Sequence, residues 1–112
     1  MKKAGIINPA LCRAIASLGH TDSIVICDAG LPIPEGVERI DLSLVRDVPS
    51  FNQVFHAIVE ELQVEQAVMA EEAICENPRV VEVVTEALGK DKVKFVPHSE
   101  LKELTESAKA VV

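Results

Sequence analysis

The sequence predicts an α/β fold, a three-layer α/β/α arrangement around a mostly parallel sheet. Short apolar runs, typical of strands covered on both faces, alternate with longer segments whose apolar residues recur at helical spacing. Two of the longer segments begin with an asparagine–proline pair, and another begins with a serine–glutamine capping box. Because strands that alternate with helices are typical of this class, we expect a single domain over residues 1–112.

The first predicted helix begins at Asn8, whose side chain is a favoured cap, with Pro9 at the first helical position. Gly19 stands where a residue in the left-handed conformation would end that helix. The apolar run over residues 23–27 predicts a strand covered on both faces, and Asp28 closes it.

Segment 29–36 contains two prolines and two glycines, so it is predicted to be a loop. Residues 37–42 predict a second strand, weaker than the first because it contains charged residues. Ser50 and Gln53 have the spacing of a capping box. The helix that they begin has an apolar face formed by Phe51, Val54, Phe55, Ile58 and Leu62.

The second half of the chain repeats the alternation. Residues 66–70 predict another buried strand, and Asn77 with Pro78 begins a helix that Gly89 ends. Residues 92–96 predict the next strand.

The last part of the chain is predicted to contain a turn, a helix and the beginning of a strand. Residues 97–98 form the turn, and Ser99 begins a helix that continues to about Ala108. The apolar residues 110–112 resemble the opening of a further strand, because chain termini are normally polar. We expect that strand to be cut off or left out.

The charge balance argues against a nucleic-acid partner. The chain has 11 basic and 18 acidic side chains, a net charge of −7, with no basic run. Its aromatic residues are three phenylalanines, which leaves no platform for stacking bases. No apolar run reaches the roughly 20 residues that span a bilayer, and no signal peptide is apparent. We therefore expect a cytoplasmic protein with no membrane partner and a neutral or cationic ligand.

The cysteines and histidines do not predict a metal site. Cys12, Cys27 and Cys75 are widely spaced, so we interpret them as small hydrophobic residues. The histidines also lack close ligand spacing, and His56, in the middle of a helix, is interpreted as structural or as an oligomer contact. Phosphate-binding glycine loops and a Gly-x-Ser-x-Gly elbow are absent from the sequence. We expect no metal and no nucleotide cofactor.

Polar residues follow the predicted strands where each strand ends, the edge at which open α/β sheets bind ligands. Asp28 follows the first strand, Glu71 and Glu72 follow the third, and His98 follows the fourth. His20 lies in the connection that enters the Asp28 strand, from which it could fold back over that edge. Histidine can give and take a proton at neutral pH, and a carboxylate can orient it or bind sugar hydroxyl groups.

Each of these residues also has a structural interpretation. His20 could interact with the dipole at the carboxyl end of the first helix, and Asp28 could hold the following loop as an Asx turn. Glu71 and Glu72 could begin a helix or be solvated, and His98 could flank the last helix.

Five segments along essentially the whole chain together resemble the D-ribose pyranase family, which is related to the L-fucose mutarotases. The most specific are Gly-His-Thr-Asp at 19–22 and Asp-Ala-Gly-Leu-Pro-Ile-Pro at 28–34, and the others lie at 39–41, 48–51 and 70–72. The mutarotase branch carries a bulkier residue and an aromatic where this chain has Gly30 and Leu31. The resemblance therefore favours ribose over fucose.

The resemblance implies a Rossmann-like fold of ribose-pyranase type and interconversion of the pyranose and furanose forms of D-ribose, without a cofactor. By family position, His20 is the catalytic proton donor, and Asp28 and His98 bind the sugar. The resemblance also implies a cyclic homo-oligomer with sites at subunit boundaries, commonly a decamer of two five-membered rings.

The family also has a C-terminal segment with a tyrosine and an asparagine at the substrate. This chain has no tyrosine and its last residue is Val112, so we expect the domain to lack that segment. Two alternatives therefore stay open: a non-catalytic sugar-binding or transport-associated module, and a mutarotase acting on fucose or a related sugar.

Overall fold

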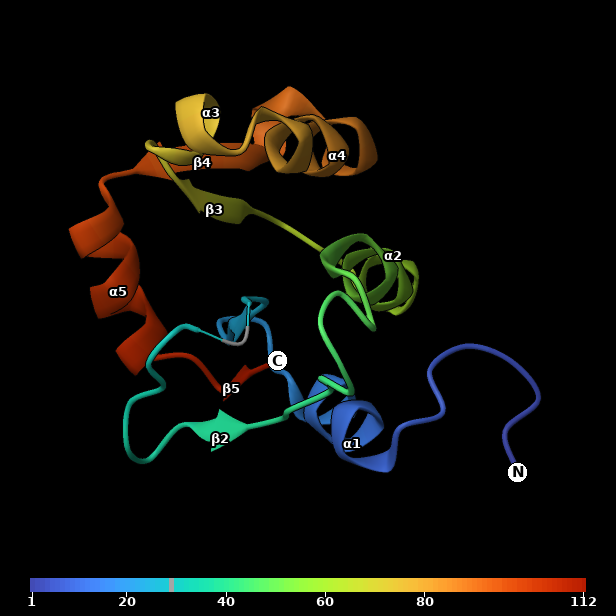
Figure 1. Ribbon diagram of the computed structural model, residues 1–112. Helices are drawn as coiled ribbons and strands as arrows, with labels where there is room; N and C mark the ends of the chain where they lie inside the picture. Colours follow the sequence, from blue (N-terminus) through green and yellow to red (C-terminus); the bar gives the residue numbers. More distant parts are fainter. Residues whose placement is uncertain (29) are drawn as a thin grey trace. The chain divides into compact units, whose positions relative to one another are not determined.

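The computed structural model describes residues 1–28 and 30–112 (Figure 1). The chain divides into two compact units, of which the first comprises Met1–Leu62 with Thr105–Val112 and the second Gln63–Leu104. Each is described by itself. Across the described residues, no helix combines the length and the apolar character that crossing a membrane requires.

The first unit contains a parallel sheet of three short strands in the order β1 (Ile24–Val25), β5 (Ala110–Val111), β2 (Glu38–Arg39). The central strand therefore comes from the far end of the sequence (Figure 1). Backbone hydrogen bonds continue the pairing of β1 with β5 on both sides, from Ser23 to Cys27. The apolar ending of the chain does form a strand, as the sequence predicts, and this strand joins the other two.

The core of the first unit surrounds this central strand. Ala110 and Val111 are completely buried, and Ile58 is 1% exposed. The strand predicted over residues 23–27 is half-buried at its centre rather than fully covered. The residues that pack into one buried cluster with Ala110 and Ile58 are Ile6, Leu11, Ala14 and Ile40.

Two helices cover this sheet, and both begin at the predicted caps. In α1 (Pro9–Ser17) the Asn8 side chain accepts a hydrogen bond from the Leu11 N–H at 2.9 Å. In α2 (Phe51–Glu61) Ser50 and Gln53 form the complete capping box. The predicted role of Gly19 was wrong: α1 is capped by Leu18 in an extended conformation, and Gly19 does not have a positive φ. Leu18 is half-buried, and its N–H donates to the Ile15 carbonyl at 3.2 Å to complete the last turn.

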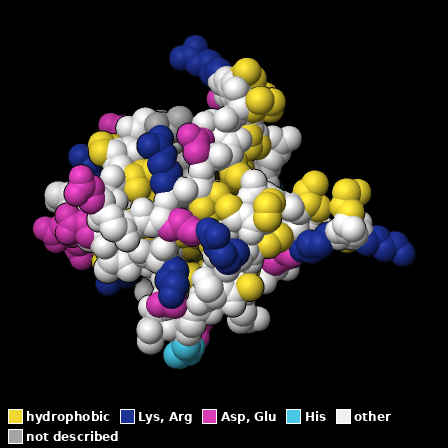
Figure 2. Space-filling view, turned by 90° about the horizontal axis from the view of Figure 1, so that it is seen from below, with side chains coloured by type: hydrophobic (Ala, Val, Ile, Leu, Met, Phe, Trp, Pro, Cys, Tyr) yellow, Lys and Arg dark blue, Asp and Glu magenta, His cyan; other side chains and the backbone are white. Residues whose placement is uncertain are grey.

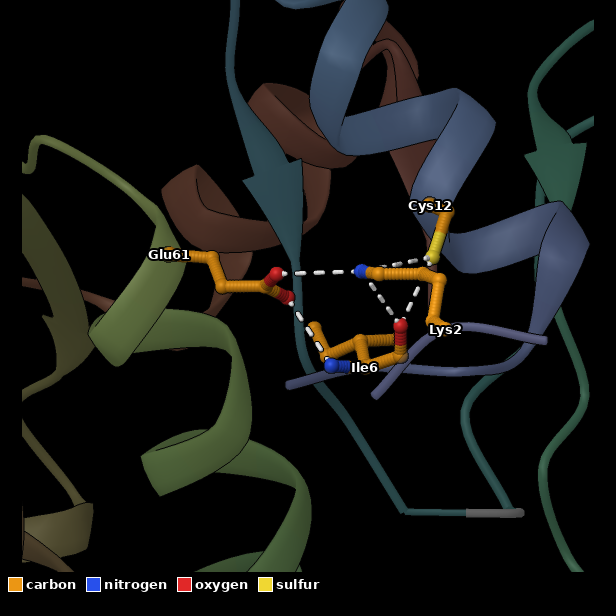
Figure 3. Close-up of polar contacts among 4 residues, drawn as sticks. All are labelled: Lys2, Ile6, Cys12 and Glu61. Atoms are coloured by element: carbon orange, nitrogen blue, oxygen red, sulfur yellow. Dashed lines mark hydrogen bonds and ion pairs between the residues drawn. The ribbon is translucent and has the colours of Figure 1, made fainter. Parts of the chain in front are cut away.

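The N-terminal arm is attached to the end of α2 by a group of polar contacts, which Figure 3 shows. The Glu61 carboxylate accepts the Ile6 N–H at 3.3 Å and pairs with the Lys2 ammonium at 3.5 Å. Lys2 and the Cys12 thiol also donate to the Ile6 carbonyl, at 2.8 and 3.0 Å. Gly5 has φ +75°, and a Cβ atom there would lie 2.9 Å from Glu61 Oε1. The positive φ therefore favours glycine at this turn, and an added Cβ atom would displace the end of the Glu61 side chain.

The second unit contains a parallel pair of strands, β3 (Ala67–Ala70) and β4 (Val93–Val96), with all four residues in register. Helices α3 (Ala73–Glu76) and α4 (Pro78–Leu88) contact β3 and β4 respectively (Figure 1). A 3₁₀ turn, η1 (Lys90–Lys92), leads into β4, and α5 (His98–Glu106) follows it. The parallel α/β class is confirmed, with the described strands paired in two sheets.

Several local predictions in the second unit need correction. The short helix α3 begins directly after Glu72, in agreement with the structural interpretation of Glu71 and Glu72 as a helix start, although its bounds were not predicted. Its last turn uses the Asn77 N–H, which donates to the Ala73 carbonyl at 2.9 Å. The Asn77 side chain makes no capping hydrogen bond, although α4 does begin at Pro78. Helix α5 begins at His98 rather than Ser99, and Cys75 is exposed rather than buried. Gly89 ends α4 with φ 89°, as predicted.

Candidate functional site

A cleft of about 670 Å³ lies at the carboxyl ends of the three strands of the first unit. The residues that follow β1, β2 and β5 all line it, so the strand topology places the cleft where parallel sheets bind ligands. Most of its wall is apolar. The charged and hydroxyl side chains among its lining residues are Asp28, Arg39, Asp41, Ser43, Arg46, Asp47 and Ser50.

Asp28 lies in this cleft and also holds the turn that follows β1. Its Oδ1 accepts the Gly30 N–H at 3.0 Å, which is the Asx turn that the structural interpretation predicts. The hydrogen bond uses one carboxylate oxygen and leaves further acceptor positions on an exposed side chain. Both interpretations of Asp28 are therefore compatible with its position. Burial and the Asp28 charge together raise the pKa of the neighbouring Cys27 thiol, which stays a poor nucleophile.

A second carboxylate, Asp41, lines the same cleft and was not predicted as a site residue. It accepts the Ser43 N–H at 2.9 Å and the Ser43 hydroxyl, and Arg39 Nη2 lies 3.8 Å from its Oδ2. These hydrogen bonds, with a smaller effect of the Arg39 charge, lower the pKa of Asp41. The signal in the sequence was the pair of charged residues, Arg39 and Asp41, at the end of a predicted strand. We interpreted them as weakening that strand and as part of the family resemblance, without assigning Asp41 a role in the site.

His20 lies at the tip of an exposed turn between α1 and β1. The Asp22 N–H donates to the Gly19 carbonyl at 3.2 Å and closes this turn. Lys109, just before β5, donates its N–H to the Ser23 carbonyl, so the turn lies at the amino ends of the strands. His20 does not occur among the described residues that line the cleft. Within one chain, His20 and Asp28 are therefore at opposite ends of β1, and the structure does not fold His20 back over the Asp28 edge.

The other predicted residues belong to the second unit. His98 is the first residue of α5, and its N–H donates to Glu72 Oε2 at 3.0 Å. The carboxylate of Glu72 thus caps this helix, an arrangement that the helix dipole favours. The Glu71 N–H extends the ladder of the strands by donating to the Val96 carbonyl at 2.8 Å. The imidazole of His98 stays on an exposed residue at the carboxyl end of β4.

The arrangement suits binding of a small polyhydroxylated ligand. Carboxylates accept hydrogen bonds from hydroxyl groups and arginine donates them, and the first unit presents both in a largely apolar cleft. His56 lies exposed on α2 with its ring against Phe55. In the part of the chain that the structure describes, no group of three or more His, Cys, Asp or Glu side chains could hold a metal ion.

Comparison with known families and proteins gives matches along the whole chain. The model of the RbsD / FucU transport protein family matches residues 1–112. A protein of Geobacillus kaustophilus named D-ribose pyranase is 51% identical, covering 100% of this chain and 82% of the relative. A D-ribose pyranase of Pasteurella multocida is 45% identical and is covered over 86% of its length.

Comparison with solved structures also gives a match along nearly the whole chain. "The Structure of Bacillus subtilis RbsD complexed with D-ribose" matches with a TM-score of 0.94 and 42% identity, over 99% of this chain and 85% of that one. The fold class predicted from the sequence, a three-layer α/β arrangement with parallel strands, is therefore confirmed.

Proposed function

Because the chain belongs to the RbsD / FucU transport protein family, we propose that it is an isomerase that interconverts the pyranose and furanose forms of D-ribose. The observation that carries the proposal is the similarity to D-ribose pyranases over the full chain, at 51% and 45% identity. The fold of a ribose-bound relative, with a TM-score of 0.94, supports the same substrate.

The reaction needs proton transfer and no redox step. Protonation of the ring oxygen, as the anomeric hydroxyl loses its proton, breaks the bond between that oxygen and the anomeric carbon and gives the open aldehyde. Rotation about a carbon–carbon bond brings a different hydroxyl to the aldehyde, and the same transfers in reverse close the second ring. Since the proton released equals the proton taken up, one acid–base group is sufficient. General acid–base catalysis of this kind contributes roughly 10²–10⁴-fold.

We assign His20 as the proton donor and Asp28 and His98 as sugar-binding residues. Histidine can act in both directions near neutral pH, and the turn between α1 and β1 presents His20 to solvent. The acceptor positions that the Asx turn leaves on Asp28 suit a sugar hydroxyl. The Glu72 carboxylate binds the backbone of His98, which leaves the imidazole for a ligand.

We further propose that the domain acts in the cytoplasm as a ring-shaped homodecamer with its sites between copies. Two observations support assembly. His20 and Asp28 lie at opposite ends of β1, so the His20 that acts at an Asp28 cleft would come from a neighbouring copy. Large apolar side chains also reach the surface, as Figure 2 shows for one face, and those of Leu44 and Val45 are 79% and 64% exposed.

A second candidate function is a non-catalytic sugar-binding or transport-associated module. The description of the matching family as transport proteins favours it. The names of the relatives favour the enzyme, and they also favour ribose over the alternative of a fucose mutarotase.

Saturation-transfer NMR on D-ribose separates the two functions. When a pyranose anomeric signal is irradiated, its saturation should be transferred to the furanose signals faster with the protein than in buffer. Exchange no faster than in buffer, together with ribose-induced shifts of protein signals, would instead identify the binding module. The same experiment with L-fucose checks specificity, and faster exchange of fucose than of ribose would contradict the assignment to ribose.

A further inference from the structure

The turn that carries His20 is closed twice, once by the backbone and once by a side chain. The Asp22 N–H donates to the Gly19 carbonyl at 3.2 Å, which places His20 and Thr21 at the two central positions of the turn. In the opposite direction, the Gly19 N–H donates to Asp22 Oδ2 at 2.7 Å. This second bond is short and charge-assisted, so it is the stronger of the two.

This second bond brings the Asp22 carboxylate close to Gly19. A Cβ atom at Gly19 would lie 3.3 Å from Asp22 Oδ2, which is tighter than ordinary contact. The φ of Gly19 is not positive, so backbone conformation does not require glycine there. Close approach of the Asp22 carboxylate therefore favours glycine at this position.

Asp22 also connects the turn to the central strand of the first unit. Its Oδ2 lies 3.8 Å from the Lys109 ammonium, and the Lys109 N–H donates to the Ser23 carbonyl at 2.9 Å. Both side chains are partly exposed, at 34% for Asp22 and 48% for Lys109, so the ion pair itself adds little stability. The geometry of the turn, more than the stability of the fold, therefore depends on Asp22.

We propose that Asp22 is a positioning residue for the reaction, acting through the turn that holds the backbone of His20. This inference rests on the proposed function, in which His20 transfers the proton. The Asp22 carboxylate fixes the path of the chain on both sides of His20, because it binds the Gly19 N–H while its own backbone closes the turn. Without that carboxylate, the imidazole samples positions from which it does not reach the sugar.

The test compares four single variants and one double variant in the ribose exchange measurement, over a range of ribose concentrations that gives both kcat and KM. Asp22→Ala is expected to lower kcat between about ten- and a hundredfold with an unchanged KM, since small misplacements of a reacting group have effects of this size. Asp22→Asn keeps an acceptor for the Gly19 N–H and should stay within about threefold of wild type, as should Lys109→Gln, which removes only the ion pair. Gly19→Ala should lower kcat in the wild type and not in the Asp22→Ala background, because the two act on one contact.

An NMR relaxation measurement makes the test independent of activity. The backbone order parameter at His20 should be about 0.85 in the wild type and in Asp22→Asn, and fall below about 0.6 in Asp22→Ala. Equal order parameters in all three proteins would overturn the inference, and so would a loss of kcat in Asp22→Ala that Asp22→Asn does not restore. If the wild type does not accelerate exchange, the proposed function fails, while the order parameters still decide whether Asp22 holds the turn.

Discussion

The two units of the chain each begin a helix with an asparagine–proline pair, and they use it differently. In the first unit Asn8 is extended, and its side chain caps α1 by accepting the Leu11 N–H at 2.9 Å. In the second unit Asn77 has φ −144° and ψ 60°, and its side chain makes no capping bond. The difference arises upstream, because the Asn77 N–H already completes the last turn of α3. A capping residue is therefore effective only where the preceding chain leaves it extended.

The units also differ in how their strands are stabilised. The first unit has strands of two residues around a completely buried centre at Ala110 and Val111. The second has a regular pair of four-residue strands, in which Val96 is buried and most other positions are half-buried or exposed. Burial of side chains thus contributes more to the stability of the strands in the first unit, and regular backbone pairing contributes more to it in the second.

The largest effect on stability is expected from truncating the buried valines. Val111→Ala should lower the free energy of unfolding by about 2–3 kcal/mol, from the lost burial and the cavity left at a completely enclosed site. Val84→Ala, at a helix position that is 4% exposed in the second unit, should cost about 1–2 kcal/mol, because a smaller core collapses more easily. Urea denaturation measures both. Equal losses would contradict the difference between the units.

The next effect concerns the turn at the N-terminal arm. Gly5→Ala should cost about 2 kcal/mol, since it combines a positive φ with a Cβ atom 2.9 Å from Glu61 Oε1. Gly36→Ala is the matched control: it has φ +87° and open space around the added atom, so backbone strain alone should cost about 1 kcal/mol. Thermal unfolding measures the loss of stability in both variants, and the difference between the two losses is the steric contribution at Gly5. A smaller loss for Gly5→Ala than for Gly36→Ala would show that the arm is not held as described.

The asparagine–proline pairs can be compared directly. Asn8→Ala should lower the free energy of unfolding by about 1 kcal/mol, the usual cost of losing a side-chain cap. Asn77→Ala should change it by less than about 0.3 kcal/mol, because no capping bond is lost. Denaturant titration of both variants checks this, and a loss for Asn77→Ala as large as that for Asn8→Ala would refute the explanation.

The smallest effect is a pH dependence that arises in the cleft. The pKa of Asp41 is lowered from its ordinary value of 3.8, first by its hydrogen bonds with Ser43. A lowered pKa in the folded state stabilises the fold above pH 3.8, and this contribution is lost as the pH falls through the lowered pKa. Asp41→Asn should therefore be less stable than wild type at neutral pH, with the difference disappearing in acid. Ser43→Ala should give a smaller change of the same sign, and a difference that grows in acid would contradict this assignment.

Local signals in the sequence predicted most of the elements and one part of the candidate site. The capping box at Ser50, the glycine that ends α4 and the strand-end position of Asp28 depend on neighbouring residues, so they were predictable. The central position of β5 depends on contacts between distant segments, which periodicity does not reveal. Asp41 was missed for the same reason, because its place in the cleft follows from the pairing of β2 with β5.

The central claim, that this domain interconverts ribose ring forms through His20, is tested most directly by the exchange rate of a His20→Ala variant. We expect exchange between pyranose and furanose signals to fall at least about a hundredfold, the minimum contribution of a general acid–base group. His56→Ala, which removes an exposed histidine on α2, is the matched control and should keep the wild-type rate, with size-exclusion chromatography checking that its oligomeric state equals that of wild type. A folded His20→Ala protein that exchanges ribose within about threefold of wild type would contradict the claim.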